Sequence, residues 1–271
     1  MIIMIDCHTH TYYSHDSTQD PKETIPFAIE KGLEYLAFTD HCDKDCLFNP
    51  AYKDKIRQID LNSCFKELRF LQEQYKGKIE LAVGLECGYM KQATPMYEKI
   101  LKDYPTDITI NSVHLVDFMD CYYREFFERK TKLQAYGQYV QAIYDSLFVP
   151  YHYDVVAHIG YVVRKAPYED KSLNYSDFPD LFDSILKTII EKGKALEVNT
   201  HAENTGFYTL PNPIILKRYK ELGGELLTIA TDAHKKEKLG FEYDNALSYL
   251  KDLNFKYLFK YLNHKPIAVK I

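Results

Sequence analysis

Two pairs of potential metal ligands lie far apart in this sequence. His8 and His10 follow the apolar run MIIMID with one residue between them, and Asp232 and His234 have the same spacing. Because side chains alternate along an extended segment, residues two positions apart project from the same face. Imidazole and carboxylate groups are ligands that suit Zn, Mn and Fe. Each pair therefore predicts part of a metal site.

Further metal-capable side chains follow other β-rich runs. A single strand-end histidine is more often a hydrogen-bonded structural residue, and a single strand-end carboxylate more often caps the next helix. Here the same residue types recur at the end of run after run, which packing alone does not explain. Since ligands of α/β proteins bind at the carboxyl ends of the strands, we expect one edge to carry the whole set. It consists of His8, His10, Asp40, His41, Glu86, His114, His158, Asp232 and His234.

The segments that must position these side chains alternate between β-rich runs and amphipathic stretches. The seven β-rich runs span 2–7, 34–40, 79–86, 108–114, 153–158, 194–199 and 225–233. The helical stretches include 22–32, 59–77, 94–103, 132–148, 178–193 and 212–224, and several end in glycine, as helices often do. Strands joined by helical crossovers predict a parallel sheet. Seven strands favour a closed barrel, with an open doubly wound sheet as the alternative.

The composition is that of an ordinary globular chain without a surplus of basic residues. Of 271 residues, 46% are hydrophobic and 27% are charged, and the formal net charge is −5. This balance argues against a nucleic-acid partner, and no apolar stretch approaches the roughly 18 residues of a membrane helix. No linker or repeat divides the sequence, so we expect a single domain over 1–271. The first residues lack the pattern of a signal peptide, which favours a cytoplasmic protein.

Several residues that could bind metals fall outside the strand-end set. The six cysteines are expected to be reduced thiols, and the one close pair, Cys42 and Cys46, lacks a second pair to complete a zinc site. His152 and His264 are expected to be surface or packing residues. His201 follows the sixth β-rich run, so we expect it to line the pocket without binding metal.

Four motifs resemble those of the PHP (polymerase and histidinol phosphatase) superfamily, a group of phosphoesterases. The first is Asp6-Cys7-His8-Thr9-His10-Thr11, followed by Ser14 and Asp16, and the second is Phe38-Thr39-Asp40-His41. The strand-end pair His114 and His158 is the third, Thr231-Asp232-Ala233-His234 is the fourth, and Glu86 completes the pattern. The resemblance runs through essentially the whole chain, and it implies a distorted (β/α)7 TIM-like barrel.

The resemblance also implies two to three divalent metal ions, Zn, Mn or Fe, with ligands carried over by position. The first ion would be held by His8, His10, Glu86 and Asp232. Glu86 would bridge to a second ion held by His114 and His158, and a third would be held by Asp16, His41 and His234. His15 competes with Asp16 for this role, although the Ser-x-Asp spacing from Ser14 matches the family better.

Within the superfamily, the second half of the chain resembles the stand-alone histidinol-phosphate phosphatases. Shared features include the Glu-x-Asn run at 197–199 and the Lys-Lys-Glu-Lys-Leu-Gly stretch after His234. The implied reaction is hydrolysis of a small-molecule phosphate ester, L-histidinol phosphate, in histidine biosynthesis. Arg164 matches a phosphate-binding arginine of that branch, and the alternative for it is a solvated loop cation.

The sequence defines other roles in this reaction less narrowly. Asp16, His41 and His234 lie in the region where an acid would protonate the leaving group, and the sequence does not choose among them. The polar and aromatic segment 115–132 is expected to form a loop or a lid. Its candidates for binding the amine and imidazole of the substrate are Asp117, Asp120, Tyr122 and Tyr123.

Three other functions fit parts of the pattern. A PHP-type nuclease or nucleotide phosphatase uses the same chemistry but requires a basic groove. A metal-dependent amidohydrolase also begins with His-x-His, but it usually has a lysine-derived bridge and a lone aspartate, unlike Glu86 and the Asp232–His234 pair here. A non-catalytic metal-binding module would not need a complete ligand set together with Arg164. The oligomeric state is left open.

Overall fold

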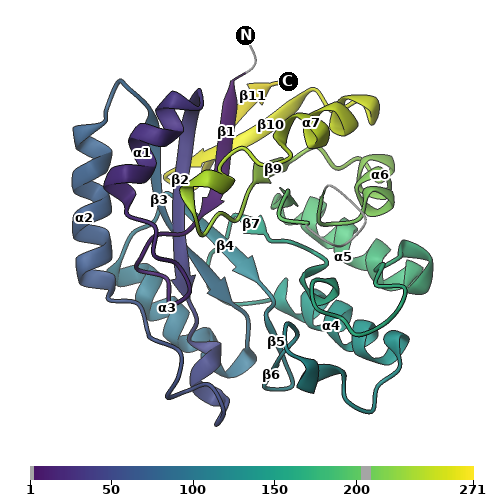
Figure 1. Cartoon of the computed structure of the whole chain (residues 1–271). Coiled ribbons are helices and arrows are strands. Elements are labelled where there is room, and N and C mark those ends of the chain that lie inside the picture. The colour runs from purple at the N-terminus through teal and green to yellow at the C-terminus, as the bar shows by residue number, and fades with distance from the viewer. Residues whose placement is uncertain (1–2, 203–208) are drawn as a thin grey trace.

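Seven parallel strands form a barrel that closes between β1 and β9 (Figure 1). The computed structural model describes residues 3–202 and 209–271. Thr9 bridges Ala233 across the closure, and the amide of Asp232 donates to the carbonyl of His8. The predicted TIM-like barrel is confirmed, and the open sheet is excluded. In sheet order the strands are β1 (Met4–Thr9), β2 (Leu33–Cys42), β3 (Glu80–Gly88), β4 (Ile108–Ser112), β7 (Val155–Val156), β8 (Ala195–Asn199) and β9 (Leu227–Ala230).

The barrel is distorted because its strands differ in length and register. β7 has 2 residues whereas β2 has 10, and the β1–β2 pairing shifts register twice. Gly84 allows β3 to approach β4 closely, since a Cβ atom at this position would lie 2.3 Å from the carbonyl oxygen of Ile108. This close contact fixes the course of β3 just before Glu86.

Amphipathic helices surround the barrel (Figure 1). On α2 the buried residues Cys64, Phe65, Leu68 and Leu71 form one apolar stripe, as their helical spacing predicts. The six predicted helical stretches are confirmed with bounds that differ by a few residues. Among the described residues, no helix has the length and apolar character needed to cross a membrane. The α-helices are α1 (Pro21–Glu30), α2 (Leu61–Gln74), α3 (Thr94–Asp103), α4 (Lys132–Ser146), α5 (Pro179–Glu191), α6 (Pro213–Glu221) and α7 (Tyr243–Asp252).

Short 3-10 turns connect several of these elements. They span Asp45–Phe48, Lys91–Ala93, Arg124–Phe127, Tyr161–Val163, Tyr175–Asp177 and Lys236–Lys238. The first and fourth of these turns directly follow β2 and β7 at the carboxyl end of the barrel, so they contribute side chains to the cavity described below.

Two hairpins and α7 were not predicted from the sequence. β5 (Leu115–Val116) and β6 (Met119–Asp120) form a small hairpin inside the segment expected to be a loop or lid. β10 (Tyr257–Leu262) and β11 (Lys265–Lys270) form a longer one, turned by Asn263 and His264 with positive φ angles of 48° and 62°. That two-residue turn with positive φ matches the twist of an antiparallel pair.

The β10–β11 hairpin is fastened to the end of the barrel where the strands begin (Figure 1). His152 Nε2 and His264 Nδ1 each lie 2.8 Å from an oxygen of the buried Asp154 carboxylate. The amide of Thr109 at the start of β4 donates to the same carboxylate, also at 2.8 Å. His264 therefore holds the hairpin to the strands through Asp154, and His152 contacts the same carboxylate from the connection between α4 and β7.

Candidate metal centre

The opposite end of the barrel, where the strands finish, gathers all the candidate ligands that the family resemblance assigned. β1, β2 and β3 supply His8, His41 and Glu86 from within the strands. The loops after β1, β4, β7 and β9 supply the remainder, so residues from the whole length of the chain converge at one place. Their mutual contacts place the side chains in three adjoining groups that meet at Glu86 and His10.

The first group joins the two ligand pairs from which the sequence argument began. His8 Nε2 and His10 Nε2 are 3.1 Å apart, and His10 Nε2 is 3.1 Å from Asp232 Oδ1. Glu86 Oε2 lies 3.4 Å from His8 Nε2 and 3.7 Å from His10 Nε2. Asp232 reaches this position from a left-handed backbone conformation with φ 52°, which aspartate tolerates better than most residues.

The second group surrounds the other oxygen of the same glutamate. Glu86 Oε1 lies 2.9 Å from His158 Nε2 and 3.2 Å from His114 Nε2, and these two nitrogens are 3.4 Å apart. The two oxygens of Glu86 thus face different pairs of imidazoles. This is the geometry that a carboxylate bridging two metal ions requires.

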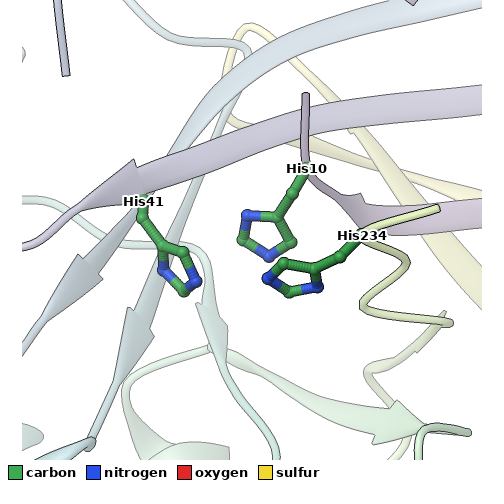
Figure 2. A group of neighbouring side chains, drawn as sticks. All are labelled: His10, His41 and His234. Atoms are coloured by element: carbon green, nitrogen blue, oxygen red, sulfur yellow. The ribbon is translucent and has the colours of Figure 1, made fainter. Parts of the chain in front are cut away.

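The third group contains Asp16, His41 and His234. Asp16 Oδ2 lies 3.6 Å from His41 Nε2 and 3.2 Å from His234 Nε2. Figure 2 shows the rings of His41 and His234 converging on His10, whose ring centroid lies 4.2 Å and 4.1 Å from theirs. The ring centroid of His15 lies 5.4 Å from that of His41, and its Nδ1 is 3.5 Å from Asp43 instead of contacting Asp16 or His234. Of the two neighbours considered in the sequence, Asp16 is the one that faces this group.

The ligand nitrogens are arranged in a way that suits a bound cation better than hydrogen bonds between the side chains. Glu197 Oε1 lies 2.7 Å from His8 Nδ1, and a carboxylate can only accept, so the neutral form of the His8 ring carries its lone pair on Nε2. Ser14 donates to Asp40 and therefore accepts from His10 Nδ1, which leaves a lone pair on His10 Nε2 as well. With both rings neutral, two lone pairs would face each other at 3.1 Å, and a proton or a metal ion between the two nitrogens removes this repulsion.

A second contact supports the same fit. His41 Nδ1 lies 2.7 Å from Glu86 Oε2, yet both atoms are buried and neither has a hydrogen-bond partner. The distance is short, but the orientation does not suit a hydrogen bond. Buried polar atoms without partners are rare in folded proteins, and an ion is one of the standard explanations.

The local charges keep the candidate carboxylate ligands ionised. Burial opposes ionisation of Glu86, but the imidazoles of His41, His8 and His114 hold its pKa well below the usual value. Burial likewise opposes ionisation of Asp232, and Arg164 and His8 hold its pKa well below the usual value. Ionised carboxylates are the form that binds metal.

Two buried carboxylates have supporting roles that were not predicted from the sequence. Glu197, fully buried on β8, contacts His8 and also accepts from the amide of His158 at 2.7 Å. Asp40, which the sequence placed among the metal-capable residues, instead accepts from Thr11 and Ser14 and so holds the loop after β1. Both carboxylates orient groups that themselves face the centre, and nothing in the spacing of the sequence distinguishes Glu197 from an exposed strand glutamate.

Arg164 lies beside the first group, at the edge of a cavity of about 440 Å³. One Nη atom donates to Asp232 Oδ2 at 2.9 Å, and the guanidinium lies over the ring of Tyr161, 5.2 Å from its centroid. Its Nε is buried and has no hydrogen-bond partner. His201 also lines the cavity, as predicted, with Nδ1 4.0 Å from Asp232.

The segment 115–132 contributes part of the predicted set to this cavity. Asp120, Tyr122 and Tyr123 line it. Asp117 does not: its side chain is exposed and borders a different hollow, next to α4. The proposed role of Asp117 in substrate binding was therefore wrong, because the β5–β6 turn directs this residue away from the centre.

Comparison with known proteins agrees with the motifs and the geometry. The PHP domain family matches residues 6–201, a span that includes the candidate ligands from His8 to His158. The chain belongs to the PHP domain family. This PHP domain protein is 30% identical to the histidinol-phosphatase of Lactococcus lactis over 93% of this chain and 91% of that protein. It is 24% identical to the histidinol-phosphatase of Bacillus subtilis, over 88% of this chain and 96% of that protein.

Solved structures of similar proteins share the fold. Histidinol phosphate phosphatase from Lactococcus lactis, solved in complex with zinc, L-histidinol and phosphate, matches this PHP domain protein with a TM-score of 0.87 at 30% identity. The match covers 97% of this chain and 98% of that one. A structure from Listeria monocytogenes, with a TM-score of 0.78 at 19% identity, supports the fold alone.

Proposed function

We propose that this protein is a metal-dependent phosphatase that hydrolyses L-histidinol phosphate to L-histidinol and phosphate. One observation carries the proposal: Glu86 presents its two oxygens to separate imidazole pairs, and its neighbour His114 lines a cavity together with Arg164. The relatives of similar length named histidinol-phosphatase support the choice of substrate. A cytoplasmic location stays a prediction from the sequence.

The residues proposed to hold metal are those of the three groups. His8, His10, Glu86 and Asp232 would hold one ion, Glu86 with His114 and His158 a second, and Asp16, His41 and His234 a third. Zinc in the Lactococcus lactis structure supports zinc as one of them, and manganese and iron suit the same ligands. When bound, such ions neutralise the phosphate dianion and activate a water molecule.

The side chains of this protein would orient the ester for attack by water. A new bond forms between the water oxygen and phosphorus as the water loses a proton, and the ester P–O bond breaks as the departing alkoxide takes one up, so the reaction needs no net proton. Arg164 has a buried Nε with no partner and lies next to Asp232, so its guanidinium is placed to bind non-bridging phosphate oxygens. Glu197 and Ser14 contact the Nδ1 atoms of His8 and His10 and so leave the Nε2 atoms facing the proposed metal centre.

Turnover of a small panel of phosphate esters tests the proposal. Protein reconstituted with zinc or manganese should hydrolyse L-histidinol phosphate with a kcat/KM that exceeds that for p-nitrophenyl phosphate by up to about 10⁴-fold, the range that recognition of polar groups can reach. A nuclease or nucleotide phosphatase would instead prefer single-stranded oligonucleotides or nucleoside bisphosphates. Preference for either of these over L-histidinol phosphate would contradict the proposal.

A further inference from the structure

A further cluster of metal-capable side chains lies at the end of the barrel where the strands begin, away from the candidate metal centre. It consists of His152, Asp154 and His264, and we call it the distal cluster. One ligand atom from each residue lies within 4.8 Å of the other two. The amide of His264 donates to the carbonyl of Asp107 at 2.8 Å, which holds the hairpin turn against the start of β4.

The distal cluster has the geometry of an open three-ligand site. His152 Nε2 and His264 Nδ1 each lie 2.8 Å from a different oxygen of the Asp154 carboxylate. The two rings are inclined by 72° with their centroids 4.5 Å apart, so they approach the carboxylate from two directions. Imidazole and carboxylate ligands with one open position form a common zinc site, in which the ligand atoms lie about 3.3 Å apart. Each ring would have to move outward by only about 0.5 Å.

The burial of the three side chains allows this movement. The Asp154 side chain is 3% exposed, and one of its oxygens also accepts from the amide of Thr109, so the carboxylate is fixed. The side chains of His152 and His264 are 53% and 35% exposed. The rings can therefore shift, and water can reach the open position.

Both histidines can present a lone pair to an ion without losing a proton. Without an ion, each neutral ring donates to Asp154 from its nearer nitrogen. When an ion binds, the proton belongs on the other nitrogen. His264 Nε2 lies 3.4 Å from Thr106 Oγ1, which can accept it there, and the half-exposed His152 can donate to water. Metal-bound histidines usually donate from the second nitrogen in this way.

The charge of Asp154 also favours an ion. Within residues 3–202 and 209–271, its ion-pair partners are these two histidines alone. Lys194, just before β8, donates to the carbonyl of Tyr153 instead. Neutral imidazoles satisfy the hydrogen bonds of the buried carboxylate but not its charge, whereas a divalent ion satisfies both.

We propose that the distal cluster binds a divalent transition-metal ion and that this ion fastens the β10–β11 hairpin to the start of the barrel. The proposal does not depend on the reaction catalysed at the other end. The ion should bind more weakly than those of the candidate metal centre, because its ligands are fewer and more exposed. Since the ligands come together only in the folded chain, binding should stabilise the protein.

Two variants remove the ligand atoms and keep the hydrogen bonds. In His152→Gln and His264→Asn, the side-chain amide can donate to Asp154 in place of the ring, but an amide nitrogen has no lone pair for zinc. Asparagine also tolerates the φ of 62° at position 264. Lys265→Gln changes an exposed neighbour outside the distal cluster and is the control.

Zinc is the probe, and its content after equilibrium dialysis against excess zinc is the first measurement. The wild type and Lys265→Gln should bind one ion per chain more than His152→Gln and His264→Asn. The second measurement is the urea midpoint of unfolding at low and at excess free zinc. The midpoint should rise more with zinc in the wild type and Lys265→Gln than in the two histidine variants.

Equal zinc content in the four proteins would overturn the proposal, and so would a loss confined to one of the two histidine variants. A loss of more than one ion per chain would also overturn it, because these residues would then support the candidate metal centre at a distance. If the zinc content differs by one ion but zinc raises all four midpoints equally, the ion does not fasten the hairpin.

Discussion

Glu197 determines which nitrogen of His8 faces the metal centre. Its Oε1 accepts a hydrogen bond from His8 Nδ1, and its Oε2 accepts from the amide of His158 and the side-chain amide of Asn199. One buried carboxylate therefore fixes a candidate ligand from β1 and the backbone of another after β7. Such outer contacts commonly contribute 10- to 100-fold to metal affinity.

Replacing Glu197 should accordingly weaken metal binding without unfolding the protein. Because glutamine can donate as well as accept, Glu197→Gln no longer enforces the His8 tautomer, and zinc affinity should fall about 10- to 100-fold. Competition with a chelator measures this directly. Glu191→Gln, an exposed position at the end of α5, is the matched control. Equal zinc affinity in the two variants would show that Glu197 does not support metal binding through His8.

Arg164 provides a second prediction at the level of single residues. A guanidinium presents a planar fork to phosphate oxygens that an ammonium group cannot reproduce. Arg164→Ala should therefore lower kcat/KM for L-histidinol phosphate about 10- to 150-fold, and Arg164→Lys should restore only part of it. Since Arg164 also pairs with Asp232, zinc content has to be measured alongside. If metal-loaded Arg164→Ala has near-wild-type kinetics, Arg164 does not bind the phosphate and serves only as a structural partner of Asp232.

Among the elements, the β10–β11 hairpin depends on a charged contact. Asp154 is buried beneath it, between His152 and His264. Burial alone would raise the pKa of the Asp154 carboxyl, but hydrogen bonds from His152, His264 and the Thr109 amide more than offset this and lower the pKa below its usual value. The folded state thus binds this proton less readily than the unfolded chain.

The sign of the resulting pH dependence follows from that shift. A carboxyl whose pKa is depressed by folding stabilises the protein above its unfolded pKa of about 3.9, and the stabilisation is lost as the pH falls through the folded pKa. Asp154→Asn should therefore be less stable than the wild type by about 1.5–3 kcal/mol at pH 7. The difference should shrink at pH 3. Urea unfolding at both pH values measures it, and a difference independent of pH would contradict this role.

Across the whole molecule, the sequence predicted the centre better than its surroundings. The strand-end positions of His8, Glu86 and Asp232 were predictable because parallel strands finish at one edge and metal ligands are few in kind. Glu197 was not, since a glutamate inside a strand carries no periodic signal. The β10–β11 hairpin was overlooked because its two-residue turn, Asn263 and His264, lacks the glycine that usually marks one. The single domain over 1–271 stays a prediction.

The direction of Asp117 illustrates what spacing cannot supply. Asp117 and Asp120 are equally acidic and lie three residues apart, yet only Asp120 faces the cavity. The β5–β6 turn decides this, with positive φ angles at Asp117 and Phe118. Without knowledge of that turn, the sequence gives no reason to prefer Asp120 over Asp117. Substrate-binding residues in such loops can therefore be assigned only from the structure.

The central claim is a centre of several metal ions that hydrolyses L-histidinol phosphate. Titration of metal-free protein with zinc, with bound zinc and phosphate release measured on the same samples, tests both halves together. We expect turnover to appear as two to three ions bind per chain, because Glu86 joins two imidazole pairs and each pair would hold one of the ions that the proposed reaction uses. Full turnover with no zinc or one ion per chain, or no turnover of L-histidinol phosphate at any loading, would contradict the account.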